Sequence, residues 1–308
     1  MADVTRLLML AMLVAAPVRA AISVVDDTGA NVRLATPATR IVTLAPHAAE
    51  LVYAAGAGAR IVGVIKGTDY PLAAQSLPVV GDVTALDLER IVMLAPDLIV
   101  TWPWTTPAQI AWLRARDVAV FEANAPTIDG IATDIERIGM LAGTGATAHD
   151  AAAAFRERVA QLARESRDGP RLRVFYQVSG APLFTLGGKH LVSEAIARCG
   201  GRNVFAAMTL PAPQVSVEAV VAADPQVIIA GTDGAKRPAW LDAWARLPAL
   251  DAVRHRALYA VDANLLHRPG PRFVDGIAQL CRTLAKARGA HASDAYNPPA
   301  ARASGATR

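Results

Sequence analysis

The fold is decided by two similar stretches, ERIVMLAPDLIV at residues 89–100 and EAVVAADPQVII at residues 218–229. In each stretch a glutamate stands seven positions before a proline, and a short run rich in Ile and Val follows. Proline ends a short helix because it has no amide hydrogen to donate, and a continuous apolar run is typical of a buried parallel strand. The repeat therefore predicts two lobes built alike, one in each half of the chain. A chance match between two helix–strand units is the alternative.

The rest of the chain alternates between strand-like and helical patterns. Residues 41–44 and 61–65 are short apolar runs separated by a helical pattern at residues 48–55, and residues 172–178 begin the same alternation in the second half. Alternation of this kind predicts parallel strands joined by crossover helices. We therefore expect an α/β fold with a mostly parallel central sheet in each lobe.

One long helix is expected to connect the lobes at residues 145–168. The segment is rich in Ala, Glu and Arg, and apolar residues such as Phe155 and Val159 recur in it at helical spacing. This places the N-terminal lobe at residues 21–144 and the C-terminal lobe at residues 169–288. A helical connector limits how far two lobes can hinge.

The two ends are expected to lie outside the lobes. Residues 1–20 have the pattern of a signal peptide, in which Arg6 supplies positive charge, an apolar stretch follows and Ala20 offers a small residue for cleavage. The alternative is a retained membrane anchor, but the apolar stretch is shorter than the ~20 residues that span a bilayer. Residues 289–308 are polar with Gly, Pro and Ala, and we expect them to be disordered.

Composition and motifs exclude several classes of function. The formal net charge is only +4 and the cations are scattered, which argues against nucleic-acid binding. The chain has no Gly-x-Ser-x-Gly elbow, no His-Glu-x-x-His pair and no phosphate-binding glycine loop, so an enzyme such as a hydrolase is a remote alternative. Its two cysteines, Cys199 and Cys281, form no Cys-x-x-Cys motif. In an exported protein they would most simply form one disulfide, and two separate buried thiols are the alternative.

Several stretches between about Ile22 and Arg288 resemble a known family. They are RIVTLAPHAAEL at residues 40–51, DYP at 69–71, LERIV at 88–92 with PDL at 96–98, and PLFT at 182–185 with CGGRNVF at 199–205 and PQVS at 213–216. The chain is similar to the periplasmic binding proteins that carry cobalamin, siderophores and haem to ABC importers, and most of all to the cobalamin binders. The positions of Cys199 and Cys281 also match the disulfide of the cobalamin binders.

The resemblance implies two Rossmann-like lobes bridged by a long helix, with the ligand in the cleft between them. It also implies a non-enzymatic, monomeric protein of the periplasm that delivers cobalamin or a related corrinoid to a permease dimer and its ATPase subunits. Haem or a ferric siderophore on the same scaffold is the alternative. No intrinsic cofactor or metal is expected.

The family's ligand contacts map onto residues that follow predicted strands. Trp102 matches an aromatic wall of the cleft, where a flat ring would lie against a corrin or porphyrin. Trp104, two residues on, is a weaker candidate. Phe184 matches an aromatic contact of the second lobe, and Arg268 matches an arginine whose donors would hold the rim of the ligand. For each residue the alternative is an ordinary core or surface role.

The chain departs from the cobalamin binders at three aromatic positions, where it has Gly67, Val83 and Ala212. Two histidines, His47 and His267, appear instead in loops that the family places at the cleft. Because imidazole coordinates cobalt and haem iron, either histidine is a candidate axial ligand to a bound cofactor metal. A polar loop histidine without a metal is the alternative for each.

The same family keeps the Asp69-Tyr70-Pro71 stretch in its cobalamin binders. A structural turn is therefore a better interpretation of Tyr70 than an iron ligand.

The resemblance also implies that the two glutamates of the repeat, Glu89 and Glu218, dock the protein to the permease. One acidic residue from each lobe pairs with permease arginines in the family. Both glutamates fall near predicted helix starts, where a negative charge also favours the helix dipole, which is the structural alternative.

Overall fold

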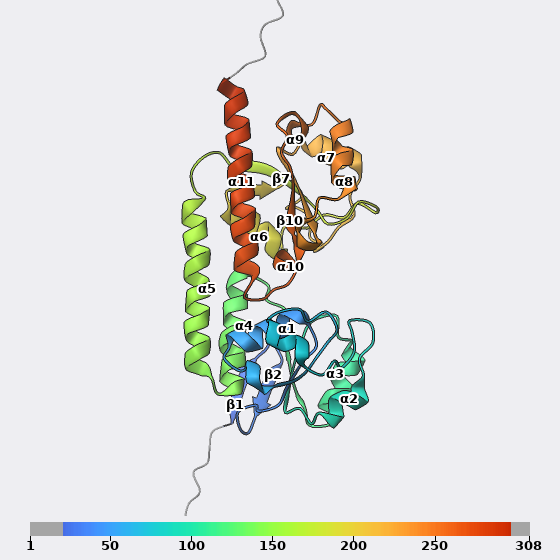
Figure 1. Cartoon of the computed structure of the whole chain (residues 1–308), viewed down its shortest axis with the longest axis vertical. Coiled ribbons are helices and arrows are strands. Elements are labelled where there is room, and N and C mark those ends of the chain that lie inside the picture. The colour runs from blue at the N-terminus through green and yellow to red at the C-terminus, as the bar shows by residue number, and fades with distance from the viewer. Residues whose placement is uncertain (1–20, 297–308) are drawn as a thin grey trace, which may run out of the picture.

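A computed structural model describes residues 21–296, and its two lobes each contain a four-stranded parallel sheet (Figure 1). The first lobe begins with a two-stranded antiparallel hairpin, β1 (Ile22–Val25) and β2 (Asn31–Leu34). The other elements of the first lobe are β3 (Ile41–Thr43), α1 (Pro46–Ala54), β4 (Ile61–Val64), α2 (Leu88–Met93), β5 (Leu98–Thr101), α3 (Pro107–Arg114), β6 (Ala119–Glu122) and α4 (Ile128–Ala142).

The second lobe repeats this plan after a long helix, α5 (Gly145–Glu165). Its elements are β7 (Leu172–Gln177), α6 (Leu191–Arg198), β8 (Gly201–Asn203), α7 (Val217–Ala223), β9 (Val227–Thr232), α8 (Ala239–Asp242), α9 (Asp251–Arg254), β10 (Leu258–Asp262), α10 (Ala263–Leu266) and α11 (Phe273–Tyr296). The signal peptide predicted at residues 1–20 lies outside the described residues.

The two sheets have the same topology. The first has the order β4-β3-β5-β6 and the second β10-β9-β7-β8, so in each lobe the second, first, third and fourth strands along the chain are neighbours in that order. All pairings within both sheets are parallel. The expected α/β fold with two similar lobes is confirmed.

The repeat occupies equivalent positions in the two lobes. The first copy forms α2 and the third strand, β5, and the second copy forms α7 and the third strand, β9. Ala95 and Asp224, the residues before the two prolines, both have a positive φ, at 44° and 39°. Non-glycine residues seldom adopt this conformation, so the matching backbone supports a common plan for the lobes.

The long helix α5 runs beside both lobes (Figure 1). It packs along α4 of the first lobe and also against α11 of the second lobe. Phe155, Val159 and Leu162 form its buried stripe, as the helical spacing in the sequence predicted. One continuous set of buried apolar residues therefore includes α4, α5 and α11.

The C-terminal helix is longer than predicted. Disorder was expected from Gly289, but α11 continues to Tyr296, so this boundary was wrong. The single Gly289 costs a helix about 1 kcal/mol, whereas the alanines around it favour helix and Nε2 of His291 lies 3.1 Å from the carbonyl oxygen of Gln226. Residues 297–308 lie outside the described part.

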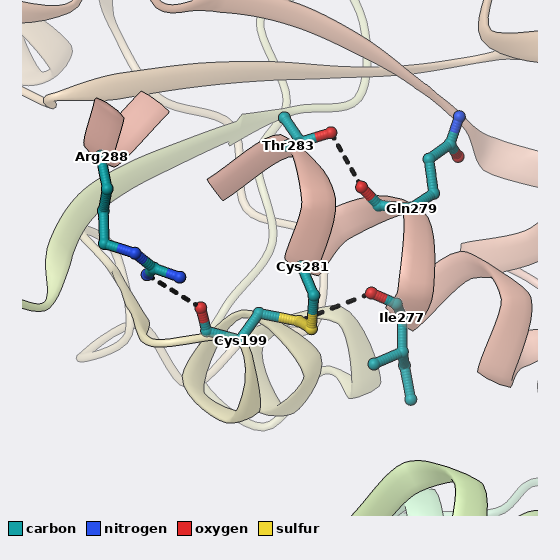
Figure 2. Close-up of a disulfide and its surroundings, with 6 residues drawn as sticks. All are labelled: Cys199, Ile277, Gln279, Cys281, Thr283 and Arg288. Atoms are coloured by element: carbon teal, nitrogen blue, oxygen red, sulfur yellow. Dashed lines mark hydrogen bonds between the residues drawn. A yellow bond between two sulfur atoms is a disulfide. The ribbon is translucent and has the colours of Figure 1, made fainter. Parts of the chain in front are cut away.

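A disulfide joins Cys199, at the end of α6, to Cys281 in the middle of α11 (Figure 2). The two half-cystines are 82 residues apart in the sequence, and both are buried. The guanidinium of Arg288 donates to the carbonyl oxygen of Cys199 at 3.2 Å, one of the contacts drawn in Figure 2. The disulfide therefore fastens α11 to the body of the second lobe.

Within residues 21–296 no helix has the length and apolar character needed to cross a membrane.

Candidate functional site

The strand order identifies one position at the carboxyl edge of each sheet where a ligand site is expected. In the order found here, the first and third strands are adjacent and their connections leave on opposite sides, which opens a crevice beyond their carboxyl ends. These strands are β3 and β5 in the first lobe, and β7 and β9 in the second. His47 and Trp102 follow β3 and β5, and Phe184 lies in the loop after β7.

His47 and the two candidate tryptophans form one aromatic cluster in the first lobe. The rings of His47 and Trp102 meet edge to face with centroids 5.5 Å apart, and those of Trp102 and Trp104 with centroids 6.3 Å apart. Trp102 is half-buried, whereas Trp104 is exposed. Trp102 therefore sits between a buried imidazole and an indole that faces solvent.

His47 is buried without hydrogen bonds to its ring. It lies in the first turn of α1, its exposed fraction is 1%, and neither ring nitrogen makes a hydrogen bond. The pKa of His47 is lowered to about 4, mainly by burial; the nearby backbone of Ala123 opposes this effect, and the positive charge of Arg268 makes a smaller contribution that also lowers the pKa. The imidazole is neutral at pH 7, and a neutral imidazole is the form that binds a metal.

His267 belongs to a second cluster, formed with Tyr176 and His190. The hydroxyl of Tyr176, at the end of β7, lies 3.1 Å from Nε2 of His267. Burial, with a smaller effect of Asp262, raises the pKa of Tyr176, so this hydroxyl keeps its proton while it shares a hydrogen bond with Nε2 of His267. Burial also lowers the pKa of His190 and of His267 to about 4. Because Nε2 of His267 is already engaged in a hydrogen bond, His267 is a poorer metal ligand than His47.

Among the described residues, three ion pairs join the lobes at this boundary, and in the longest of them Nη2 of Arg272 lies 3.7 Å from Oδ1 of Asp69. Nη1 of Arg268 lies 2.6 Å from Oδ1 of Asp69, and the guanidinium of Arg272 donates to both carboxylate oxygens of Glu50 at 3.0 and 2.6 Å. Arg272 also stacks over the ring of Tyr70 at 4.3 Å. The pKa of Arg272 is raised, first by its hydrogen bond to Glu50. The predicted ligand contact Arg268 is thus paired with the first lobe.

The segment before α11 lies directly on α1. A Cβ atom added at Gly270 would lie 3.3 Å from Cβ of His47 and 3.4 Å from Oε2 of Glu50. Glycine at this position lets the backbone of the second lobe approach the first lobe closely. The burial of His47 follows from this contact between the lobes.

Phe184 lies in the loop after β7 of the second lobe. It is half-buried, and its backbone forms bridges with Ser179 and Gln214. Pockets elsewhere in the described part of the chain include a cavity of about 540 Å³ beside β2, α3 and β6 and one of about 170 Å³ under Trp240 and Trp244. Neither pocket is lined by Trp102, Phe184 or Arg268. The structure therefore brings Trp102, His47 and Arg268 to one boundary, whereas a role for Phe184 stays a prediction.

The sequence patterns did not predict Glu50 and Arg272 as residues of the boundary. A signal for Glu50 was present, because it stands inside the apolar run of α1 and a buried carboxylate needs a partner. Its partner is 222 residues away in the sequence, and no spacing rule connects the two.

The predicted docking glutamates occupy equivalent places on the two lobes. Glu89 is the second residue of α2, after the cap Asp87, and Glu218 is the second residue of α7, after the cap Ser216. Both are exposed, and a backbone hydrogen bond, followed by one from Ser216, lowers the pKa of Glu218. In Figure 1, α2 and α7 lie on the side of the molecule away from α5, one on each lobe. The docking role itself stays a prediction.

Residues 41–265, which span both sheets, match the family described as periplasmic binding protein. The chain belongs to this family. Over 249 residues it is 37% identical to the vitamin B12-binding protein of Vibrio cholerae serotype O1, an alignment that covers 80% of this chain and 90% of that protein.

Solved structures of periplasmic binding proteins share the fold. The periplasmic vitamin B12-binding protein BtuF of Vibrio cholerae superposes with a TM-score of 0.73 at 36% identity, over 82% of this chain and 98% of that chain. The periplasmic haem-binding protein RhuT from Roseiflexus sp. RS-1 superposes with a TM-score of 0.70 at 26% identity, over 81% of this chain and 98% of that chain. The relatives are binding proteins and not enzymes, which agrees with the motifs missing from this sequence.

Proposed function

We propose that this chain is the periplasmic substrate-binding component of an ABC importer and that it binds cobalamin or a related corrinoid between its lobes. The observation that carries the proposal is the likeness to vitamin B12-binding proteins across both lobes, at 37% identity over 90% of one such protein. The likeness to the haem binder is weaker, at 26% identity.

The boundary residues supply the contacts that such a ligand needs. The half-buried ring of Trp102 offers a flat apolar surface, and the guanidinium of Arg268 offers several donors for amide groups on the rim of a corrin. Because Arg268 is paired with Asp69 at 2.6 Å, the ligand must replace this carboxylate as its partner. Binding is therefore coupled to separation of the lobes at this pair.

Haem is the second candidate, and His47 is the observation that favours it. A neutral imidazole whose nitrogens make no hydrogen bond is chemically ready to coordinate iron or cobalt. The chain also lacks three aromatic residues of the cobalamin binders, at Gly67, Val83 and Ala212.

Retention after desalting separates the two ligands. The protein is mixed with cyanocobalamin or with haemin, passed through a desalting column, and its absorbance spectrum is recorded. We expect one cobalamin per chain to be retained and no shift of the haem Soret band. Retained haem with a shifted Soret band, together with loss of cobalamin, would replace the first candidate with the second.

Delivery to a permease rests on the paired glutamates. In the double variant Glu89→Ala with Glu218→Ala we expect normal cobalamin affinity but loss of uptake by cells that depend on this protein, because surface ion pairs orient a docking partner. Glu157→Ala with Glu165→Ala, both on α5, is the matched control. Normal uptake by the first double variant would refute the docking role.

A further inference from the structure

A cluster of two histidines and an aspartate lies in the second lobe, away from the boundary between the lobes. Asp251 and His255 stand four residues apart at α9, and His291 reaches them from α11. One ligand atom from each residue lies within 4.8 Å of the others. The rings of His255 and His291 meet at right angles, with centroids 4.0 Å apart.

The hydrogen bonds fix which nitrogen of each histidine faces the cluster. Nε2 of His291 lies 3.1 Å from the carbonyl oxygen of Gln226, an atom that only accepts, so Nε2 carries the proton and Nδ1 carries the lone pair. Metal-binding histidines usually donate their second nitrogen to a carbonyl or carboxylate in this way. Nδ1 of His255 lies 2.8 Å from Oδ1 and 3.0 Å from the carbonyl oxygen of Asp251. Donor atoms around one tetrahedral zinc ion are roughly 3.3 Å apart, given metal–ligand distances near 2.0 Å.

We propose that Asp251, His255 and His291 form a site for a divalent transition-metal ion such as Zn²⁺. The ion takes the place of the proton that Nδ1 of His255 shares with Asp251, and that proton moves to Nε2 of the same ring. Two imidazoles and one carboxylate are ligands that suit Zn²⁺, Ni²⁺ and Co²⁺ and hold Mg²⁺ or Ca²⁺ poorly. This site is independent of the ligand between the lobes.

The surroundings limit the strength of the site. Asp251 also pairs with Arg254 at 3.1 Å and with Arg173 at 3.2 Å, and both guanidiniums oppose a second cation. A carboxylate has about four positions that accept, so these pairs leave room for a metal–oxygen bond. We therefore expect micromolar rather than nanomolar affinity. A bound ion would tie the last turns of α11 to α9.

Titration of the untagged chain with Zn²⁺ alone tests the proposal. We expect one ion per chain by isothermal titration calorimetry and a higher melting temperature with Zn²⁺ present. His291→Ala should weaken binding at least ten-fold and abolish the shift in melting temperature, without changing the melting temperature of the metal-free protein by more than a few degrees. Cobalamin retention should be the same in both proteins, which separates this site from the proposed function.

His149→Ala is the matched control, because His149 is an exposed histidine on α5 that also lies near a carboxylate, 3.6 Å from Glu136. It should leave Zn²⁺ affinity unchanged. His255→Ala should reproduce the loss seen for His291→Ala. A wild-type chain that binds no stoichiometric Zn²⁺, or a His291→Ala chain that binds it with undiminished affinity, would overturn the proposal.

Discussion

His47 combines two properties that are costly in a folded protein. Its side chain is almost fully buried, and neither of its nitrogens makes a hydrogen bond. A buried polar group without a partner costs about 1–3 kcal/mol, so a sequence selected for stability alone would favour an apolar side chain here. Trp102 on one side and Gly270 on the other hold the ring at the boundary where a ligand is proposed to bind.

The lowered pKa of His47 makes stability depend on pH. Its pKa is about 4 in the folded protein, against 6.5 for an ordinary histidine. Between these values the unfolded chain binds a proton that the folded chain does not, so stability is complete above pH 6.5 and is lost as the pH falls toward 4. In His47→Leu we expect this loss to be smaller and stability at pH 5 to rise by about 1 kcal/mol or more. Urea unfolding at pH 5 and pH 7.5 measures the difference. His149→Leu is the exposed control, and equal pH slopes for His47→Leu and wild type would contradict the expectation.

Asp134 has the opposite dependence on pH. Burial, followed by the charge of Asp27, raises its pKa from 3.8 to about 9. The folded protein keeps a proton that the unfolded chain loses, so this contribution to stability is complete below about pH 4 and declines as the pH rises toward 9. In Asp134→Asn the free energy of unfolding should no longer fall with rising pH through this group, a dependence of up to about 1.4 kcal/mol per pH unit. Urea unfolding between pH 6 and pH 8.5 would show it, with Asp150→Asn on the exposed face of α5 as control. A slope unchanged in Asp134→Asn would show that this carboxyl is ionised in the folded protein.

The elements were easier to predict than the contacts between them. Local patterns that extend over a few residues predict the helix–proline–strand units at Pro96 and Pro225. They also predict the connecting helix. Disorder was predicted from Gly289 because residues 289–308 are polar with Gly, Pro and Ala, whereas α11 continues to Tyr296. The pairing of Glu50 with Arg272 depends on how the two lobes meet, and a single sequence does not contain that information.

The disulfide should contribute to stability through α11. It closes a loop with a sequence separation of 82 residues, and loops of this size stabilise the folded state by roughly 4 kcal/mol in the chain-entropy treatment. We expect Cys199→Ala with Cys281→Ala to unfold at a temperature lower by about 8–16 °C. Circular dichroism at rising temperature measures the change. A reductant should lower the melting temperature of the wild type and leave the double variant unaffected; a reductant effect of similar size on both would contradict the assignment.

At the scale of the whole molecule, two lobes of the same strand order are held by α5 along one side and by ion pairs at their boundary. The pair of Glu50 and Arg272 is the more buried, because the side chain of Glu50 is only 2% exposed. The pair of Arg268 and Asp69 lies nearer solvent, since the side chain of Asp69 is 51% exposed. The first pair fastens the lobes, and the second is the one that a ligand can replace.

Asp69→Asn should therefore favour the ligand-bound state. Without the carboxylate, Arg268 has no ionic partner to give up, and we expect cobalamin affinity to rise two- to five-fold. The stability of the free protein should fall by less than about 1 kcal/mol, because one partner of the pair is exposed. Asp117→Asn, at an exposed aspartate of the same lobe, is the control for affinity measured by titration calorimetry. Weaker binding by Asp69→Asn would show that the carboxylate itself contacts the ligand.

The central claim is that a corrinoid binds at the boundary between the lobes and lies against Trp102. Titration calorimetry with cyanocobalamin on Trp102→Ala and on Trp112→Ala tests it most directly, because Trp112 is a tryptophan on α3 that stacks with Arg116. We predict that Trp102→Ala weakens binding at least ten-fold, equal to about 1.4 kcal/mol, and that Trp112→Ala binds like the wild type. Equal affinities for all three proteins, or no binding of cyanocobalamin to any of them, would contradict the claim.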